Sequence, residues 1–174
     1  MTGDGRATEE SLGIFGFKPV FGKEMGVFVC CVGINKSPQQ KRDHMPRILI
    51  IDDEESLREI LGVYSEMLGC EVELAADPSL CKSFHSDSQE CTNEKPCADI
   101  LVIDQNLPDL KGLDLIRQQT ERGCKLPPQR KAVISASLSE DEFRQAKNLG
   151  CHVMQKPITF EIFESWLQKL EEKA

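Results

Sequence analysis

Runs of apolar residues that stop at polar ones constrain the fold of this chain more than any other feature. Residues 48–51 and 100–103 are four apolar residues each, and the runs stop at Asp52 and Asp104. Unbroken runs of this length, bounded by polar residues, are typical of strands buried on both faces of a parallel sheet. Further strands are expected at residues 131–135 and 152–154, and residues 71–74 alternate as an exposed edge strand does.

A stretch with helical character follows each predicted strand. Asp77-Pro78 is typical of a helix start after the edge strand, and Ser139 with Glu142 forms a capping box before a later helix. Five strand-then-helix units predict an α/β fold, with a five-stranded parallel sheet and helices on both of its faces. The apolar helix positions are Leu57, Ile60, Leu61, Tyr64 and Leu68, then Phe143, Ala146 and Leu149, and finally Ile162, Phe163, Trp166, Leu167 and Leu170.

Composition argues against several classes of protein. The net charge of −8 argues against a nucleic-acid-binding surface. No apolar run approaches the roughly 20 residues of a membrane span, and the N-terminus lacks a secretory signal. The eight cysteines include no C-x-x-C pair, so we expect reduced thiols in a cytoplasmic protein rather than a disulfide scaffold or a zinc site. No glycine-rich phosphate loop is present, which argues against a nucleotide site.

The pattern divides the chain into two parts. Residues 1–45 lack helical or strand periodicity, so we expect a poorly ordered extension there, or a natural start at Met45. Residues 46–174 carry all the strand and helix signals and form the predicted domain. No further domain is visible after the last helix, which favours a stand-alone domain.

Polar side chains lie where four of the predicted strands end. Asp52 and Asp53 follow the first strand, Asp104 the third, Ser135 ends the fourth and Lys156 follows the fifth. Because the carboxyl ends of parallel strands share one edge, we expect these groups to converge. Crowded carboxylates favour a cation such as Mg²⁺, while a hydroxyl and an ammonium suit a phosphoryl group. The set therefore predicts phosphoryl transfer to a carboxylate.

Each of these groups also has a structural alternative. The paired aspartates can cap a helix, Ser135 can hydrogen-bond locally in a strand-to-helix turn, and Lys156 can be an ordinary surface lysine. The coincidence of four strand ends favours the functional interpretation.

Four motifs at these strand ends resemble those of the receiver domains of two-component response regulators. They are residues 48–54, 101–108, 133–136 and 155–157. The resemblance implies a flavodoxin-like fold with strand order 2-1-3-4-5. It implies that Asp104 accepts a phosphoryl group from a histidine kinase or a histidine phosphotransfer protein, and that Ser135 and Lys156 contact that group. The protein would then be a signalling protein rather than an enzyme, read by a downstream effector protein.

The resemblance also implies a metal and a docking surface. Asp53 and Asp104 would bind Mg²⁺ through their side chains, Asn106 through its backbone carbonyl and Asp52 through water. The Lys156-Pro157 bond is often cis in the family. Residues expected at the border of the docking surface are Leu57, Pro157 and Ile158, and Leu57 is equally well explained as a core residue.

The sequence departs from the family in two places, and two other functions compete. Val153 stands where the family usually has an aromatic switch residue, whose ring moves inward with the hydroxyl at the position of Ser135. The second departure is the long loop at 86–96.

A pseudo-receiver that only binds partners is one alternative function, which Val153 mildly favours. A haloacid-dehalogenase-type phosphatase is the other, but it needs a second aspartate where this chain has Asn106.

Overall fold

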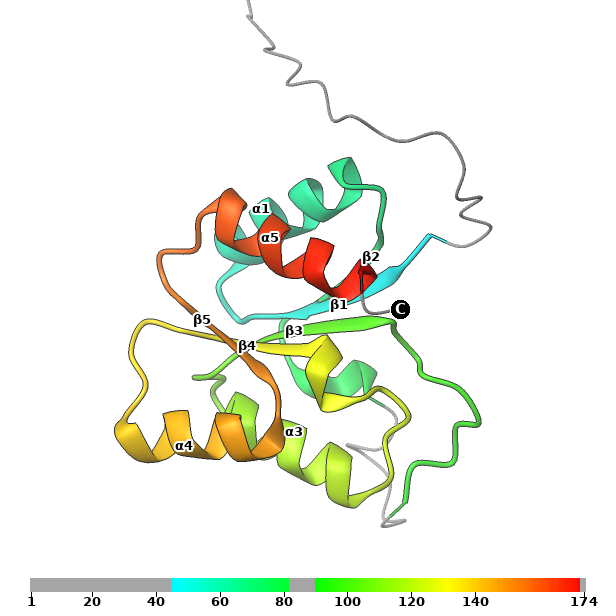
Figure 1. Cartoon of the computed structure of the whole chain (residues 1–174), viewed down its shortest axis with the longest axis vertical. Helices are drawn as coiled ribbons and strands as arrows, with labels where there is room; N and C mark the ends of the chain where they lie inside the picture. Colours follow the sequence, from blue (N-terminus) through cyan, green and yellow to red (C-terminus); the bar gives the residue numbers. More distant parts are fainter. Residues whose placement is uncertain (1–44, 82–89, 173–174) are drawn as a thin grey trace, which may run out of the picture. The chain divides into compact units, whose positions relative to one another are not determined.

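A parallel five-stranded sheet lies at the centre of the computed structural model, which describes residues 45–81 and 90–172 (Figure 1). The strand order is β2-β1-β3-β4-β5, and every neighbouring pair is parallel, which confirms the predicted flavodoxin-like class. The strands are β1 (Arg47–Ile51), β2 (Glu71–Ala75), β3 (Ile100–Asp104), β4 (Lys131–Ser135) and β5 (His152–Gln155). The helices are α1 (Glu55–Met67), α3 (Gly112–Glu121), α4 (Glu140–Leu149) and α5 (Phe160–Glu171), with 3₁₀ helices η1 (Pro78–Leu80) and η2 (Pro128–Arg130).

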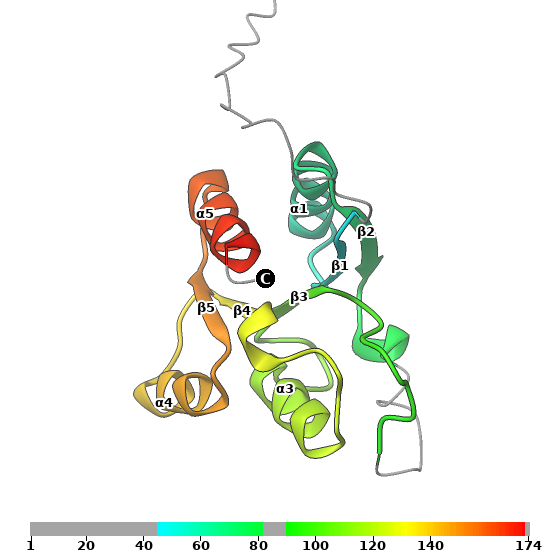
Figure 2. The same ribbon diagram turned by 45° about the vertical axis from the view of Figure 1, so that its right-hand side comes forward.

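Helices cover both faces of the sheet (Figures 1 and 2). Successive side chains along a strand point to opposite faces, so each buried strand supplies two layers of core. Ile48 and Ile50 of β1 pack in the cluster that contains Phe163 of α5. Leu49 of β1 packs in the cluster that contains Leu113 of α3. The unbroken apolar runs of the sequence are thus explained by burial on both sides.

Local signals place several helix ends. The capping box is present: the Ser139 hydroxyl accepts from the Glu142 backbone N–H, and the Glu142 side chain accepts from the Ser139 backbone N–H. Gly150 ends α4 in the left-handed conformation, with φ of 77°. Such a backbone favours glycine, so this predicted helix end is confirmed.

The segment after β2 differs from the prediction. In the described residues, Asp77 caps only the three-residue 3₁₀ helix η1, through a bond from the Ser79 N–H, rather than the start of an α-helix. Residues 82–89 lie outside the described residues, as do residues 1–44, so the expectations for those stretches are not addressed. Residues 90–96 contain neither helix nor strand, as expected of the long loop.

Three apolar side chains that were expected on the buried helix faces are instead about half exposed. Ile60 is 52% exposed, Phe143 59% and Ile162 49%. Successive helix residues differ by 100° in direction, so Ile60 and Ile162 stand well to the side of their buried neighbours Leu61 and Phe163. No helix among the described residues has both the length and the apolar character needed to cross a membrane.

One glycine fixes the approach of α3 to the end of β3. A Cβ atom at Gly112 would lie 2.5 Å from the backbone oxygen of Asp104, closer than any side chain tolerates. The Gly112 N–H donates to the Gln105 carbonyl oxygen at 3.0 Å. The absence of a side chain at Gly112 therefore lets the helix start directly behind the predicted acceptor.

Candidate phosphorylation site

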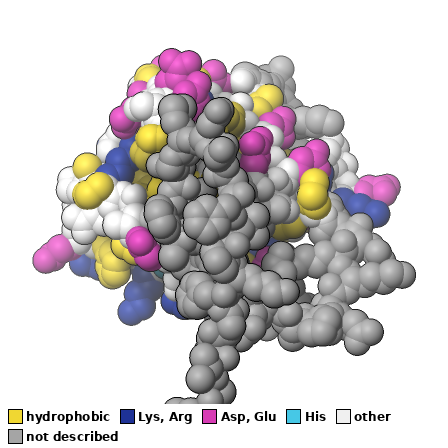
Figure 3. Space-filling model, turned by 90° about the horizontal axis from the view of Figure 1, so that it is seen from above, with side chains coloured by type: hydrophobic (Ala, Val, Ile, Leu, Met, Phe, Trp, Pro, Cys, Tyr) yellow, Lys and Arg dark blue, Asp and Glu magenta, His cyan; other side chains and the backbone are white. Residues whose placement is uncertain are grey.

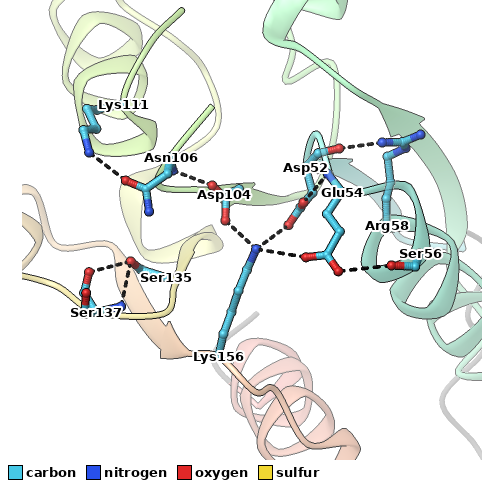
Figure 4. Close-up of polar contacts among 10 residues, drawn as sticks. All are labelled: Asp52, Glu54, Ser56, Arg58, Asp104, Asn106, Lys111, Ser135, Ser137 and Lys156. Carbon is cyan, nitrogen blue, oxygen red and sulfur yellow. Dashed lines mark hydrogen bonds and ion pairs between the residues drawn. The ribbon is translucent and has the colours of Figure 1, made fainter. Parts of the chain in front are cut away.

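Three elements bring Asp52, Asp104 and Lys156 together at the carboxyl edge of the sheet (Figure 4). The Lys156 ammonium nitrogen lies 2.7 Å from Asp104 Oδ1 and 3.2 Å from Asp52 Oδ2. Glu54 Oε2 is 4.0 Å away from the same nitrogen. The backbone N–H of Lys156 donates to the Ser135 carbonyl oxygen at 2.8 Å, which ties the end of β5 to that of β4. No role was predicted for Glu54, although it belongs to the acidic motif.

Burial makes the charges of this cluster strongly interdependent. Asp52 is fully buried and Asp104 is 3% exposed. Burial raises the pKa of the Asp52 carboxyl, although the Glu54 N–H and Lys156 partly oppose this, and the charge of Asp104 adds to the rise. Burial disfavours the charge of Lys156, but Asp104 and Asp52 outweigh it and raise the pKa of the ammonium. The site holds excess negative charge around the partly exposed ammonium of Lys156.

The turn after β3 holds the Asp104 carboxylate from the other side. Asp104 Oδ2 accepts a hydrogen bond from the Asn106 N–H. The Asn106 side-chain oxygen accepts from Lys111 Nζ at 2.6 Å, and residues 106 and 111 form an isolated bridge. Both carboxylate oxygens of Asp104 therefore have a donor, and the side chain has a fixed direction.

Ser135 lies at the end of β4, but its hydroxyl faces its own turn. The side chain is buried, and its Oγ donates to the Ser137 carbonyl oxygen at 2.7 Å. The Ser137 backbone N–H donates in turn to Ser135 Oγ at 3.3 Å. The local hydrogen bond that the sequence left open as an alternative is thus present in this structure, and a phosphoryl contact from Ser135 stays a prediction.

The carboxylate and carbonyl oxygens at this edge suit a hard cation such as Mg²⁺. Among the described residues, no group of three His, Cys, Asp or Glu side chains is arranged to hold a metal. Lys156 lies between the carboxylates of Asp52 and Asp104, while Asp53 is exposed beside them. Mg²⁺ keeps several waters and needs one or two carboxylates, so a site with few protein ligands suits it.

The residues expected to border a docking surface do line one groove. Leu57, Pro157 and Ile158 border a groove of about 660 Å³ beside Lys156, together with Ile60, Phe160 and others. The Lys156–Pro157 bond is cis, as the resemblance implied. Figure 3, which looks down on the side of α1 and α5, shows hydrophobic side chains beside acidic ones.

Val153 lies away from that groove. It is half-buried on β5, opposite Val133 of β4, and packs against the core cluster on the α3 and α4 side. Its small side chain lies within the sheet framework rather than on an exposed face.

A family match decides what kind of domain this is. Residues 48–167, more than half of the chain, match the model of the response regulator receiver domain. The chain belongs to the response regulator receiver family. The matched span contains all the polar residues of the site, from Asp52 to Lys156.

Two curated relatives contain a similar receiver domain. The chain is 33% identical over 82 residues to the alkaline phosphatase synthesis transcriptional regulatory protein SphR of Synechococcus elongatus, covering 47% of this chain and 32% of SphR. It is 27% identical over 130 residues to the sensor protein EvgS of Escherichia coli K12, covering 73% of this chain and 10% of EvgS. The receiver domain therefore corresponds to only a minor part of each of these longer proteins.

Solved receiver structures share the fold. Chemotaxis protein CheY4 of Vibrio cholerae superimposes with a TM-score of 0.57 at 23% identity, covering 73% of this chain and 99% of CheY4. The beryllofluoride-activated NtrC4 receiver domain gives 0.59 at 25% identity, covering 74% of this chain and 98% of that one. The HemR receiver domain of Leptospira biflexa gives 0.58 at 26% identity, covering 72% and 93%.

Proposed function

We propose that this receiver domain accepts a phosphoryl group on Asp104 from a histidine kinase or a histidine phosphotransfer protein. The observation that carries the proposal is the Asp104 carboxylate, buried at the sheet edge 2.7 Å from Lys156 and near the carboxylate of Asp52. We place the domain at residues 46–174, with residues 1–45 as an extension, and expect it to act in the cytoplasm.

The residues of the site fit nucleophilic attack on phosphorus. A carboxylate oxygen of Asp104 forms the new bond to phosphorus, and the bond from phosphorus to the donor breaks with its electron pair on the donor. Lys156 already contacts Asp104 and would hold a phosphoryl oxygen as a point charge. Ser135 would exchange its bond to the Ser137 carbonyl for one to the phosphoryl group.

Mg²⁺ would offset the negative charge that gathers during transfer. Asp53 and Asp104 would hold it through their carboxylates, Asn106 through its backbone carbonyl and Asp52 through water. Because Asp52 is buried beside Asp104, the pair favours a cation at this edge.

Signalling would run through protein contacts. The apolar residues Leu57, Pro157 and Ile158 line a groove directly beside Lys156, which suits docking of the phosphoryl donor. A downstream effector protein would read the phosphorylated state, with Ser135 and Val153 as the switch positions. We propose a signalling role, with no direct binding to nucleic acid or membrane, and at most slow self-dephosphorylation.

Incubation with acetyl phosphate and Mg²⁺ tests the proposal. We expect one phosphoryl group per chain, stable to acid and labile to base, and none in Asp104→Ala. No incorporation would favour a pseudo-receiver. Multiple turnover of small phosphate esters would favour a phosphatase of the haloacid dehalogenase type.

A further inference from the structure

Gln105, directly after Asp104, is a buried polar residue with no role in the proposed chemistry. It is 1% exposed, and both its backbone and its side chain form hydrogen bonds. The backbone N–H donates to the Ile134 carbonyl of β4 at 2.8 Å, and the backbone carbonyl accepts from Gly112 at 3.0 Å. The side-chain oxygen accepts from the Leu113 N–H of α3 at 3.0 Å.

The side-chain nitrogen of Gln105 reaches a third element. It donates to Glu142 Oε1 of α4 at 2.9 Å, across 37 residues of sequence. Leaving a buried amide without its hydrogen-bond partner costs free energy. The contact between Gln105 and Glu142 is therefore favoured in the folded chain. One residue thus links the end of β3 to β4, to α3 and to α4.

Glu142 completes the connection to the first turn of α4. Its other carboxylate oxygen accepts from the Ser139 N–H at 2.9 Å and from the Ser139 hydroxyl at 3.0 Å. The Ser139 N–H lowers the pKa of Glu142, and the Gln105 amide and the Ser139 hydroxyl lower it further. The same carboxylate therefore caps the helix and binds the residue beside the predicted acceptor.

The rest of α4 is weakly anchored. Ala146 is its only fully buried residue, and Phe143 in the second turn is 59% exposed. A helix with few buried contacts shifts or opens at low cost in free energy. The Gln105–Glu142 hydrogen bond is therefore one of the contacts that position the start of α4, beside the capping box.

We propose that Gln105 is a positioning residue that transmits the state of Asp104 to the first turn of α4 through Glu142. This inference rests on the proposed function, since it requires Asp104 to change state. Phosphorylation replaces the single negative charge of the Asp104 carboxylate with about two on the phosphoryl oxygens and draws new partners toward them. When the backbone of Asp104 shifts, Gln105 shifts with it. The first turn of α4, which Glu142 caps, then moves with Gln105.

Hydrogen–deuterium exchange of the full chain, with and without acetyl phosphate and Mg²⁺, tests this coupling. In the wild type, we expect phosphorylation to change the exchange rates of the first-turn amides of α4 by about fivefold or more, a typical scale of coupling. Gln105→Met keeps the length of the side chain and removes its amide, and Glu142→Ala breaks the same contact from a less buried position. Both should reduce the change to below about twofold while phosphate still enters.

Two matched variants separate coupling from helix capping. Glu142→Gln keeps an oxygen for Gln105 and a capping side chain, so it should retain the response. Ser139→Ala weakens the helix cap and leaves the Gln105–Glu142 hydrogen bond in place. Phosphorylation should therefore still change the exchange of the first-turn amides of α4 in this variant. A wild-type response in both Gln105→Met and Glu142→Ala, despite phosphate incorporation, would overturn the coupling alone. Absence of incorporation in the wild type would overturn the proposed function and this inference with it.

Discussion

Lys156 is shared between the buried carboxylates of Asp52 and Asp104, and this sharing dominates the site at the scale of single residues. One ammonium lies within 3.2 Å of both side chains, so two acids compete for one cation. Burial leaves the pKa of Asp52 raised in spite of that contact. The folded chain therefore tolerates an unfavourable charge at Asp52, as expected where function rather than stability selects the residues.

Replacement of Asp52 by Asn should stabilise the chain in a pH-dependent way. Folded Asp52 holds its proton above its ordinary pKa of 3.8, so the folded state binds more protons in the window above that value. The free energy of unfolding contributed by Asp52 then falls as pH rises through this window. We expect Asp52→Asn to exceed the wild type by about 1 kcal/mol at neutral pH, in urea unfolding without Mg²⁺.

The advantage of Asp52→Asn should shrink as pH falls toward the ordinary pKa of 3.8, because folded Asp52 takes up its proton as the pH falls through the window above that value. Asp53→Asn is the matched control, because the same change at an exposed neighbour removes no buried charge. An advantage that stayed constant with pH, or grew in acid, would contradict the charge argument.

At the scale of elements, the contact between the start of α3 and the end of β3 leaves no room for a side chain. Gly112→Ala would place a methyl group 2.5 Å from the Asp104 carbonyl oxygen, so backbone must move. We expect a loss of about 1–3 kcal/mol in the free energy of unfolding, together with slower phosphorylation by acetyl phosphate.

Gly62→Ala is the control for Gly112→Ala. The three atoms nearest to its added Cβ would be side-chain carbons of Leu74, the closest at 3.1 Å, and alanine is the better helix former. Equal losses in the two variants would show that the tight approach behind Asp104 has no special importance.

The elements also show what sequence alone could supply. The strands were predictable because strands buried on both faces leave unbroken apolar runs, as in residues 100–103, whereas their order was implied by the resemblance to receiver domains. Helix faces were less predictable, since Ile60 and Phe143 fit an apolar stripe yet are exposed. The short η1 helix after β2 was missed because Asp77-Pro78 marks helix starts of any length.

The polar residues of the site fall into the same two groups. Asp52, Asp104 and Lys156 were predictable as neighbours because parallel strands share one edge. The role of Gln105 was hidden, since its partner Glu142 lies 37 residues away and only the fold brings them together. The direction of the Ser135 hydroxyl was equally hidden, because a rotamer leaves no mark in a sequence.

At the scale of the whole molecule, the acceptor and the groove lie next to each other, so recognition of the donor and the chemistry can be separated by mutation. Ile60 lines the groove and is 52% exposed, so Ile60→Asp tests apolar docking with little damage to the core. We expect phosphotransfer from a histidine phosphotransfer protein that serves the wild type to fall about tenfold, as loss of one apolar anchor predicts. Acetyl phosphate needs no protein docking. The measurement that decides is therefore the rate with the phosphotransfer protein divided by the rate with acetyl phosphate.

Met67→Asp is the matched control, because Met67 is 77% exposed on the same helix and lies outside the groove. An equal fall with both phosphoryl donors, or the same fall in Met67→Asp, would mean that the groove does not receive the donor protein.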